Sequence, residues 1–296
     1  MRAVATPGRW IWGLSGLITA AVLVTAGAQL ITSAGQNEHA QPQSTATRTV
    51  TVLQPVTSLT VQSYGAPVQV TAGPVRHVQV TETLMYDGQA GGPPAGAQQT
   101  SAVPVSDLPA VVQSVSGGRL SLSAPACATS GCSVSFALTV PPDVTVSVAT
   151  EGGPVTVSGI AGANLDSGGG LVRATEIGGP LTVSTNNGPL LVDGLTGPLL
   201  ADTGGGSLTA QGVASATATV TTGGGDARVA FSAAPDSVTV STDGGSAQLA
   251  VPGGPYALTA ESDGGPQSLG IAADPGAHRS ITIISGGGPL LIRPLT

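Results

Sequence analysis

Residues 178–212 form the stretch GGPLTVSTNNGPLLVDGLTGPLLADTGGGSLTAQG. Short runs in it alternate apolar and polar residues, as in Leu181-Thr182-Val183, and each run ends at a glycine-rich step. Such alternation places apolar side chains on one face of a β-strand and polar ones on the other. The pattern recurs over the second half of the chain, 16 to 22 residues apart, at steps marked by Gly153, Gly169, Gly188, Gly205, Gly224, Gly245, Gly265 and Gly287. A period of about 20 residues with strand alternation predicts stacked β-units that share one apolar interior.

Two arrangements fit this repeat: a meander of hairpins, or a β-solenoid whose successive units stack in parallel. The near-constant unit length and the small β-branched interior residues favour the solenoid. A meander of this size would also form a broad open sheet, and the chain offers nothing to cover it. We therefore expect an all-β, β-solenoid-like domain preceded by one transmembrane helix.

The composition narrows the choice of partners. Only 8% of the 296 residues are charged and 2% are aromatic, whereas 41% are hydrophobic. The formal net charge is −7, all the basic charge comes from nine arginines, and the chain has no lysine. Nucleic-acid binding needs a basic footprint to neutralise phosphates, so this partner class is excluded. A Walker-type phosphate loop is also excluded, because it requires a lysine.

The N-terminal segment predicts export. Residues 10–31 are mostly apolar and carry no charge, and about 20 such residues suffice to span a membrane. Arg2 and Arg9 precede this stretch, so the positive-inside rule places residues 1–9 in the cytoplasm and the remainder outside. An uncleaved anchor is favoured because the apolar stretch continues to Ile31. A cleavable signal peptide, with Ala26-Gly27-Ala28 as its small-residue site, is the alternative.

The rest of the chain divides by composition. Residues 32–48 are polar and lack apolar periodicity, which predicts a flexible linker. Residues 49–296 form the expected extracytoplasmic β-strand-repeat domain, with residues 87–104 as a mobile Gly-, Ala-, Pro- and Gln-rich insertion.

From Thr49 to Thr296 the chain resembles the putative adhesin family, a bacterial β-strand-repeat domain of envelope proteins. The segments that carry the resemblance are CSVSFALTVPP (residues 132–142), DVTVSVATEGGPVTVSGIAG (143–162), GGPLTVSTNNGPLLVDGLTG (178–197) and GPLLADTGGGSLTAQG (197–212). The resemblance implies a β-solenoid-like fold at the cell surface, often behind a single anchor helix. It implies no catalytic residues.

The cysteines and histidines give little indication of a catalytic or metal-binding site. Cys127 and Cys132 are the only cysteines, and an even count in an exported protein predicts a structural disulfide between them. Zinc would need two further ligands. His39, His77 and His278 are scattered and show no ligand spacing, so we expect no metal site and no cofactor.

Acidic residues next to the glycine corners are the remaining candidates: Asp166, Asp202, Asp226, Asp243 and Asp263. In a solenoid, equivalent positions stack about 4.8 Å apart, so a row of carboxylates could bind calcium. Aspartate also favours tight corners because its side chain satisfies local backbone N–H groups, and the irregular offsets from the glycines favour this structural role.

We therefore expect a non-enzymatic, membrane-anchored, adhesin-like or envelope-binding module whose ligand is a cell-envelope or surface component. The alternative is an accessory sensor of envelope state that works through a membrane partner. A carbohydrate-active β-helix enzyme is a remote third. It would need converging carboxylates, a basic residue such as Arg173 or Arg228, and aromatic platforms that the chain largely lacks.

Overall fold

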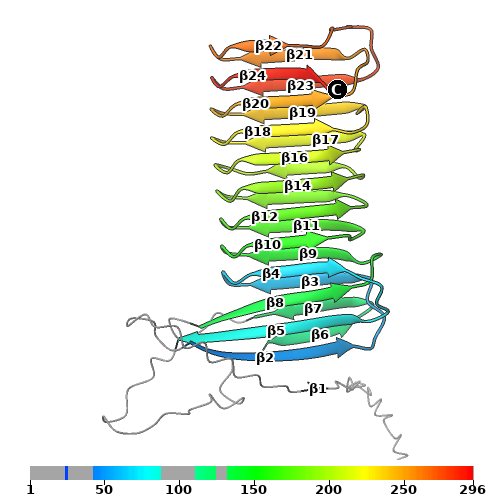
Figure 1. Cartoon of the computed structure of the whole chain (residues 1–296), viewed down its shortest axis with the longest axis vertical. Helices are drawn as coiled ribbons and strands as arrows, with labels where there is room; N and C mark the ends of the chain where they lie inside the picture. The colour runs from blue at the N-terminus through cyan, green and yellow to red at the C-terminus, as the bar shows by residue number, and fades with distance from the viewer. Residues whose placement is uncertain (1–23, 26–42, 88–110, 125–131, 296) are drawn as a thin grey trace, which may run out of the picture.

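The computed structural model describes residues 24–25, 43–87, 111–124 and 132–295. Within these ranges all regular secondary structure is β-strand, arranged in two large, mostly parallel sheets that run along an elongated stack (Figure 1). Sheet A has 13 strands, in the hydrogen-bonded order β1 (Val24–Thr25), β2 (Gln43–Val52), β5 (Val78–Asp87), β8 (Cys132–Val140), β4 (Val68–Ala72), β10 (Val155–Ser158), β12 (Val172–Ile177), β14 (Leu190–Leu195), β16 (Leu208–Val213), β18 (Ala227–Phe231), β20 (Ala247–Val251), β24 (Leu290–Pro294) and β22 (Gln267–Leu269). Sheet B has 11, in the order β21 (Ala257–Ser262), β23 (Ser280–Ser285), β19 (Ser237–Thr242), β17 (Thr217–Thr222), β15 (Leu199–Asp202), β13 (Leu181–Thr185), β11 (Gly162–Ser167), β9 (Thr145–Thr150), β3 (Ser58–Ser63), β7 (Arg119–Ser123) and β6 (Val112–Ser116).

From β9 to β20 the chain alternates between the two sheets, and each strand from β9 to β18 pairs in parallel with the strand two places further along. One strand of each sheet with its two corners makes a rung, and consecutive rungs stack directly on one another (Figure 1). The parallel pairing rules out the meander. The stacked β-solenoid that the glycine repeat predicts is therefore confirmed.

The rungs near both ends of the stack are out of chain order. The rung of β3 and β4 lies between that of β7 and β8 and that of β9 and β10. The final rung, β23 and β24, lies between that of β19 and β20 and that of β21 and β22 (Figure 1). At the N-terminal end sheet A continues through the antiparallel strands β5 and β2, which cover the edge of β8.

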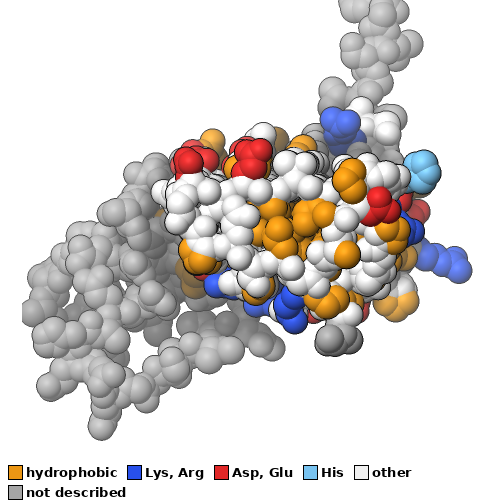
Figure 2. Space-filling model, turned by 90° about the horizontal axis from the view of Figure 1, so that it is seen from above, with side chains coloured by type: hydrophobic (Ala, Val, Ile, Leu, Met, Phe, Trp, Pro, Cys, Tyr) orange, Lys and Arg blue, Asp and Glu red, His pale blue; other side chains and the backbone are white. Residues whose placement is uncertain are grey.

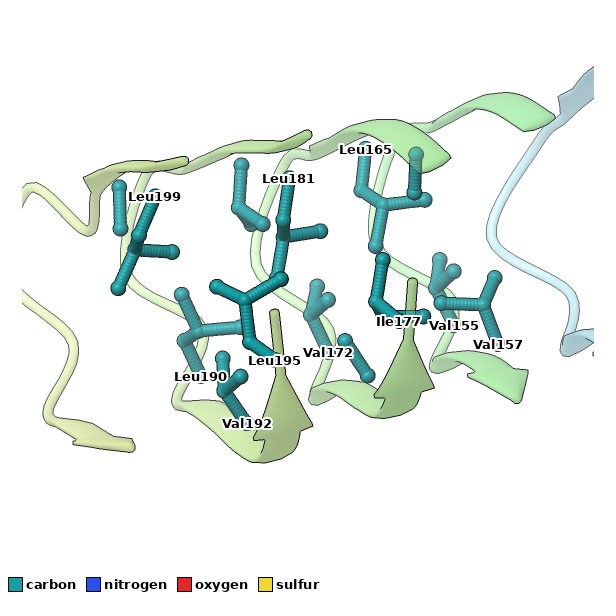
Figure 3. Close-up of a cluster of buried hydrophobic side chains, with 14 of the residues drawn as sticks. Val155, Val157, Leu165, Val172, Ile177, Leu181, Leu190, Val192, Leu195 and Leu199 are labelled. Carbon is teal, nitrogen blue, oxygen red and sulfur yellow. The ribbon is translucent and has the colours of Figure 1, made fainter. Parts of the chain in front are cut away.

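The apolar interior lies between the sheets as rows of Val, Leu, Ile and Ala that repeat from rung to rung. In β13, Leu181 and Val183 are buried, while Thr182 and Ser184 between them are exposed. Figure 3 shows Leu165, Leu181 and Leu199 from sheet B lying opposite valine and leucine side chains of sheet A. The alternation in the sequence therefore places apolar side chains in the interior between the sheets and polar side chains on the solvent-exposed faces.

From the rung of β9 and β10 onward, one corner of each rung carries a glycine at a position that has no room for a side chain. An added Cβ on Gly225 would lie against the backbone carbonyl of Gly206, which belongs to the rung before. The same close approach links the whole column, in stack order Gly153, Gly170, Gly188, Gly206, Gly225, Gly245, Gly288 and Gly265. Backbone stacked this closely tolerates no side chain.

Each of these corners is tied by a hydroxyl three residues before the column glycine. Thr222 Oγ1 donates to the carbonyl of Gly225 at 2.6 Å, and Thr203 Oγ1 donates to that of Gly206 at 2.6 Å. Ser167, Thr185, Thr242, Ser262 and Ser285 do the same at distances of 2.6 to 3.3 Å. Both threonines first named are fully buried, so their hydrogen bonds satisfy polar groups that water cannot reach.

Most of the N-terminal expectations concern residues outside the described ranges. β2 begins at Gln43, inside the linker predicted over residues 32–48, because ten residues of β2 pair with β5 and so satisfy their backbone groups. β5 ends at Asp87, and residues 88–104 of the predicted insertion lie outside the described residues. The described part of the chain contains no helix long and apolar enough to cross a membrane. Of the predicted span 10–31 only Val24–Thr25 is described, as the short strand β1 against β2, so the anchor stays a prediction.

Candidate functional site: an arginine-lined hollow on sheet A

The outer face of sheet A is interrupted by a change of register. Glu176, Gly194 and Gly212 have the positive φ angles 54°, 72° and 61°, and they follow one another on β12, β14 and β16. Each marks an extra residue in its strand, a β-bulge. β18 lacks this residue, so two residues of β16 oppose Ala230 alone and the register shifts there. The bulged column therefore ends between β16 and β18.

A shallow hollow of about 140 Å³ lies where the bulges end. Its middle is formed by two alanines on the outer face, Ala230 and Ala250, which are direct neighbours on β18 and β20. Ala250 is only 3% exposed although it faces outward, because longer side chains surround it. The rim carries polar and charged side chains, namely Thr209, Gln211, Arg228, Gln248 and Arg293, together with Leu291.

Arg228 is held in place by its neighbours. Its Nη2 donates to Asp226 Oδ2 at 2.8 Å, and Asp226 Oδ1 accepts the Ser246 backbone N–H at 2.8 Å. The Ser246 hydrogen bonds, with a further contribution from Arg228, hold the pKa of Asp226 below its usual range. The carboxylate therefore stays ionised and serves to orient the guanidinium.

Arg293 lies at the other side of the hollow, two strands away along the stack and two residues further along its strand. Within the described part of the chain its side chain makes no hydrogen bond or ion pair, and it is exposed. A strand spacing of about 4.8 Å and a rise of about 3.3 Å per residue place the Cα atoms of Arg228 and Arg293 about 12 Å apart. Two guanidinium groups thus border one hollow, and Arg293 is uncommitted.

The two outer faces differ in the charged side chains that they carry. Arg173, Arg228 and Arg293 point outward from sheet A, whereas Asp166, Asp202 and Glu261 point outward from sheet B. Seen down the stack, acidic side chains lie along part of one side and basic ones along part of the opposite side, and further acidic and basic side chains lie elsewhere on the rim (Figure 2). Asp193 on β14 and Glu176 on β12 are acidic side chains on the outer face of sheet A, and Arg119 on β7 is a basic one on sheet B. The two arginines at the hollow are therefore a local basic feature of a face that also carries acidic groups.

The structure separates most of the residues singled out from the sequence. Arg173 lies on the same face as Arg228, but β14 and β16 stand between their strands and Arg173 is outside the hollow. Cys132 opens β8 and is half-buried, while Cys127 lies outside the described residues, so the disulfide stays a prediction. His77 and His278 are exposed and lie in different parts of the stack, and His39 lies outside the described residues.

The five corner aspartates do not converge either. Among the described residues no three His, Cys, Asp or Glu side chains are grouped so that they could hold a metal ion. Asp202 accepts the Gly204 backbone N–H at 3.1 Å, and Asp226 accepts that of Ser246, as expected of aspartates that satisfy local backbone groups.

One carboxylate faces inward, near the N-terminal end of sheet A. Glu82 on β5 is 6% exposed and forms an ion pair with Arg48 on β2, with 2.6 Å between Arg48 Nη2 and Glu82 Oε2. Glu82 Oε1 is buried and has no hydrogen-bond partner. Burial raises the pKa of Glu82, and the opposing effect of Arg48 does not cancel it. Glu82 is a single carboxylate that is already paired with Arg48, so we assign it a structural role. Its Oε1, which has no hydrogen-bond partner among the described residues, makes the burial of this carboxylate less favourable.

The hollow escaped the sequence analysis because its two arginines are far apart in the chain. A signal was nevertheless present. Counted from the column glycines, Arg228 is three residues after Gly225 and Arg293 is five residues after Gly288. Offsets that differ by two residues put side chains on the same face of a sheet.

Several solved structures are similar to this chain. One is a putative cell adhesion protein from Clostridium sporogenes, with 10% identity, a TM-score of 0.25, and coverage of 86% of this chain and 100% of that one. Putative adhesins from Bacteroides fragilis and Parabacteroides distasonis are both 11% identical, with TM-scores of 0.45 and 0.37; the matches cover 86% and 84% of this chain and 99% and 97% of theirs. Their names agree with the resemblance that the sequence indicates.

No protein-family model and no curated protein matches the chain. Identities and TM-scores this low leave the function to be argued from the residues themselves.

Proposed function

We propose that this chain is a non-enzymatic, adhesin-like binding module of the cell envelope. In this proposal the β-stack stands outside the membrane, held there by residues 10–31, and binds an envelope or surface component through an outer face. The observation that carries the proposal is the arginine-lined hollow, in which Arg293 has no partner among the described residues and Arg228 is pre-oriented by Asp226. One guanidinium group without a partner and one held in place, both beside a depression on a rigid sheet, are suited to binding a ligand.

The chemistry of the hollow favours binding over catalysis. A general acid needs a pKa raised toward the working pH. The carboxylate next to the hollow, Asp226, has its pKa lowered, and both of its oxygens accept hydrogen bonds. Asp226 is therefore a poor proton donor and a good partner for Arg228.

The proposal is tested by sedimentation of the purified full chain, in mild detergent, with isolated envelope material from its own cells. We expect the chain to sediment with cell-wall or surface polymers and to release no reducing sugar from them. Release of reducing sugar would show an enzyme. Absence of binding, together with stoichiometric capture of one membrane protein from detergent extracts, would instead support the sensor alternative.

A further inference from the structure

The hollow on sheet A has features that select a ligand class, and the inference that follows rests on the binding function proposed above. Guanidinium groups present planar pairs of N–H donors that match a carboxylate in a two-pronged contact. Arg293 has all its donors available among the described residues, and Arg228 is fixed by one bond to Asp226. Because the two arginines stand on opposite sides of the hollow, a ligand that lies across it meets both.

The rest of the lining is neutral and polar. Gln211, Gln248 and Thr209 can each donate and accept hydrogen bonds, as a hydroxylated ligand requires. The alanines in the middle, Ala230 and Ala250, leave room for a ring to approach the sheet. The hollow contains no aromatic side chain, so it binds by hydrogen bonds and charge and lacks the stacking surface that flat apolar ligands prefer.

A peptide ligand fits this place poorly. Extended peptides are commonly bound by adding a strand to a free sheet edge, where backbone groups are unpaired. The hollow lies over β16, β18, β20 and β24, which are interior strands of sheet A with neighbours on both sides. Their backbone groups are already used in the parallel ladders.

The acidic character of the whole chain does not prevent an anionic ligand from binding here. Asp166, Asp202 and Glu261 point outward from the opposite sheet, and packed sheets lie about 10 Å apart, which exceeds the Debye length of about 8 Å at physiological ionic strength. The acidic groups on the near face are Asp226, which is engaged by Arg228, and Asp193 on β14 and Glu176 on β12, which lie beyond the Gln211 side of the hollow. The arginines therefore dominate the local field.

We propose that the hollow on sheet A is a binding site for carboxylate-bearing polysaccharides, with Arg228 and Arg293 holding the carboxylate of a uronic-acid unit and the glutamines binding its hydroxyls. Successive sugar units would extend from the hollow along the outer face of sheet A.

The experiment titrates oligogalacturonate into the full chain, in mild detergent at physiological ionic strength, by isothermal titration calorimetry. We expect Arg228→Gln and Arg293→Gln each to weaken binding by about fivefold, the order of effect of a partly exposed ion pair. Arg173→Gln is the matched control, because it removes the same charge from the same face outside the hollow. Ala230→Leu, which fills the hollow and keeps both arginines, is expected to weaken binding as strongly. The melting temperature of each variant shows that the fold is kept.

The competing ligands decide the specificity. Fully methyl-esterified oligogalacturonate has the same sugar backbone without the charge, and it is expected not to bind. Equal binding of the ester, or an equal loss of affinity in Arg173→Gln, would overturn the assignment of the carboxylate to the hollow. Equal, arginine-dependent binding of oligoglutamate would also overturn it, in favour of acidic peptides. If oligogalacturonate does not bind while envelope material still sediments the chain, the ligand class is wrong and the proposed function stands.

Discussion

The corner glycines provide the sharpest test of how the rungs are packed. Gly224 and Gly225 are neighbours at one corner, and neither needs a positive φ angle. A Cβ added to Gly224 would meet nothing within 4 Å, whereas one added to Gly225 would run into the backbone carbonyl of Gly206. The substitutions Gly224→Ala and Gly225→Ala therefore differ only in whether the adjacent rung blocks the new methyl group.

The cost of Gly225→Ala can be worked from these contacts. Overpacking against atoms that cannot move aside costs about 1–3 kcal/mol. Shifting the Gly225 carbonyl also weakens the 2.6 Å hydrogen bond from Thr222, and such a bond contributes about 1 kcal/mol. The sum, about 3 kcal/mol, corresponds to a drop in Tm of about 6–12 °C for a domain of this size.

Thermal unfolding followed by circular dichroism measures both variants. Gly224→Ala is expected to leave Tm unchanged or to raise it slightly, because alanine restricts the unfolded chain. If Gly225→Ala melts at the same temperature as Gly224→Ala, the rungs are not in contact at this corner and the packing described above is wrong.

Three further predictions concern single side chains. Thr222→Val removes a buried hydroxyl and leaves the carbonyl of Gly225 unsatisfied, so it should lower the free energy of unfolding by about 1–2 kcal/mol. Thr221→Val, on the exposed side of the same strand, should change this free energy by less than about 0.5 kcal/mol. Equal effects of the two variants in urea titrations would refute the role of the Thr222 hydroxyl. Glu176→Gly should raise the free energy of unfolding by up to about 1 kcal/mol, because glutamate is strained at φ 54° in a position where the next two strands have glycine. Thr175→Gly in the same strand is the control and should lower the free energy of unfolding. If both variants lose stability, Glu176 is not strained. The raised pKa of Glu82 means that the folded state binds the proton of this carboxyl more tightly than the unfolded state does. The stabilisation from this proton is therefore complete below pH 4.5 and is lost as the pH rises through the folded pKa. Glu82→Gln should flatten this part of a Tm-against-pH curve, and an unchanged curve would contradict the pKa shift.

The stacked β-architecture was predictable because two signals agree over more than 100 residues: alternation within each strand, and glycine between strands. It was harder to predict which glycine at each corner makes the close contact with the adjacent rung. In runs of three glycines any member can mark the step, and the predicted markers Gly169, Gly205, Gly224 and Gly287 each lie one residue before the glycine that makes the close contact. The hydroxyl three residues earlier identifies the right one, since it binds that glycine's carbonyl.

The order of the last two rungs could not be read from the sequence. β21 and β23 both alternate correctly, so either one could follow β19 with its apolar side chains inward. What distinguishes them is burial. β23 carries Ile281 and Ile283, which are fully buried, whereas β21 carries Leu258 and Ala260, which are half-exposed at the end of the stack. The bulkier strand takes the interior position, where it removes more apolar surface from water.

The candidate site depends directly on that order. Arg293 reaches the hollow because β24 lies next to β20, and this position is available only because the final rung inserts before the rung of β21 and β22. With strict chain order, β22 would lie beside β20 and Ser268 would stand in place of Leu291 in the row that contains Arg228. The hollow therefore arises from the order of the last two rungs, and no local sequence motif encodes it.

The central claim is therefore tested most directly by measuring the order of the rungs. Thr182, Thr282 and Thr259 occupy one outward row on sheet B, on β13, β23 and β21. Spin labels on cysteines placed at these sites, two at a time in a background without the native cysteines, report the spacings by pulsed electron paramagnetic resonance. Four strand steps separate Thr182 from Thr282 and five separate Thr182 from Thr259, which predicts backbone separations of about 19 and 24 Å. A longer distance for the pair Thr182 and Thr282 than for Thr182 and Thr259 would contradict the inserted final rung, and with it the arginine-lined hollow.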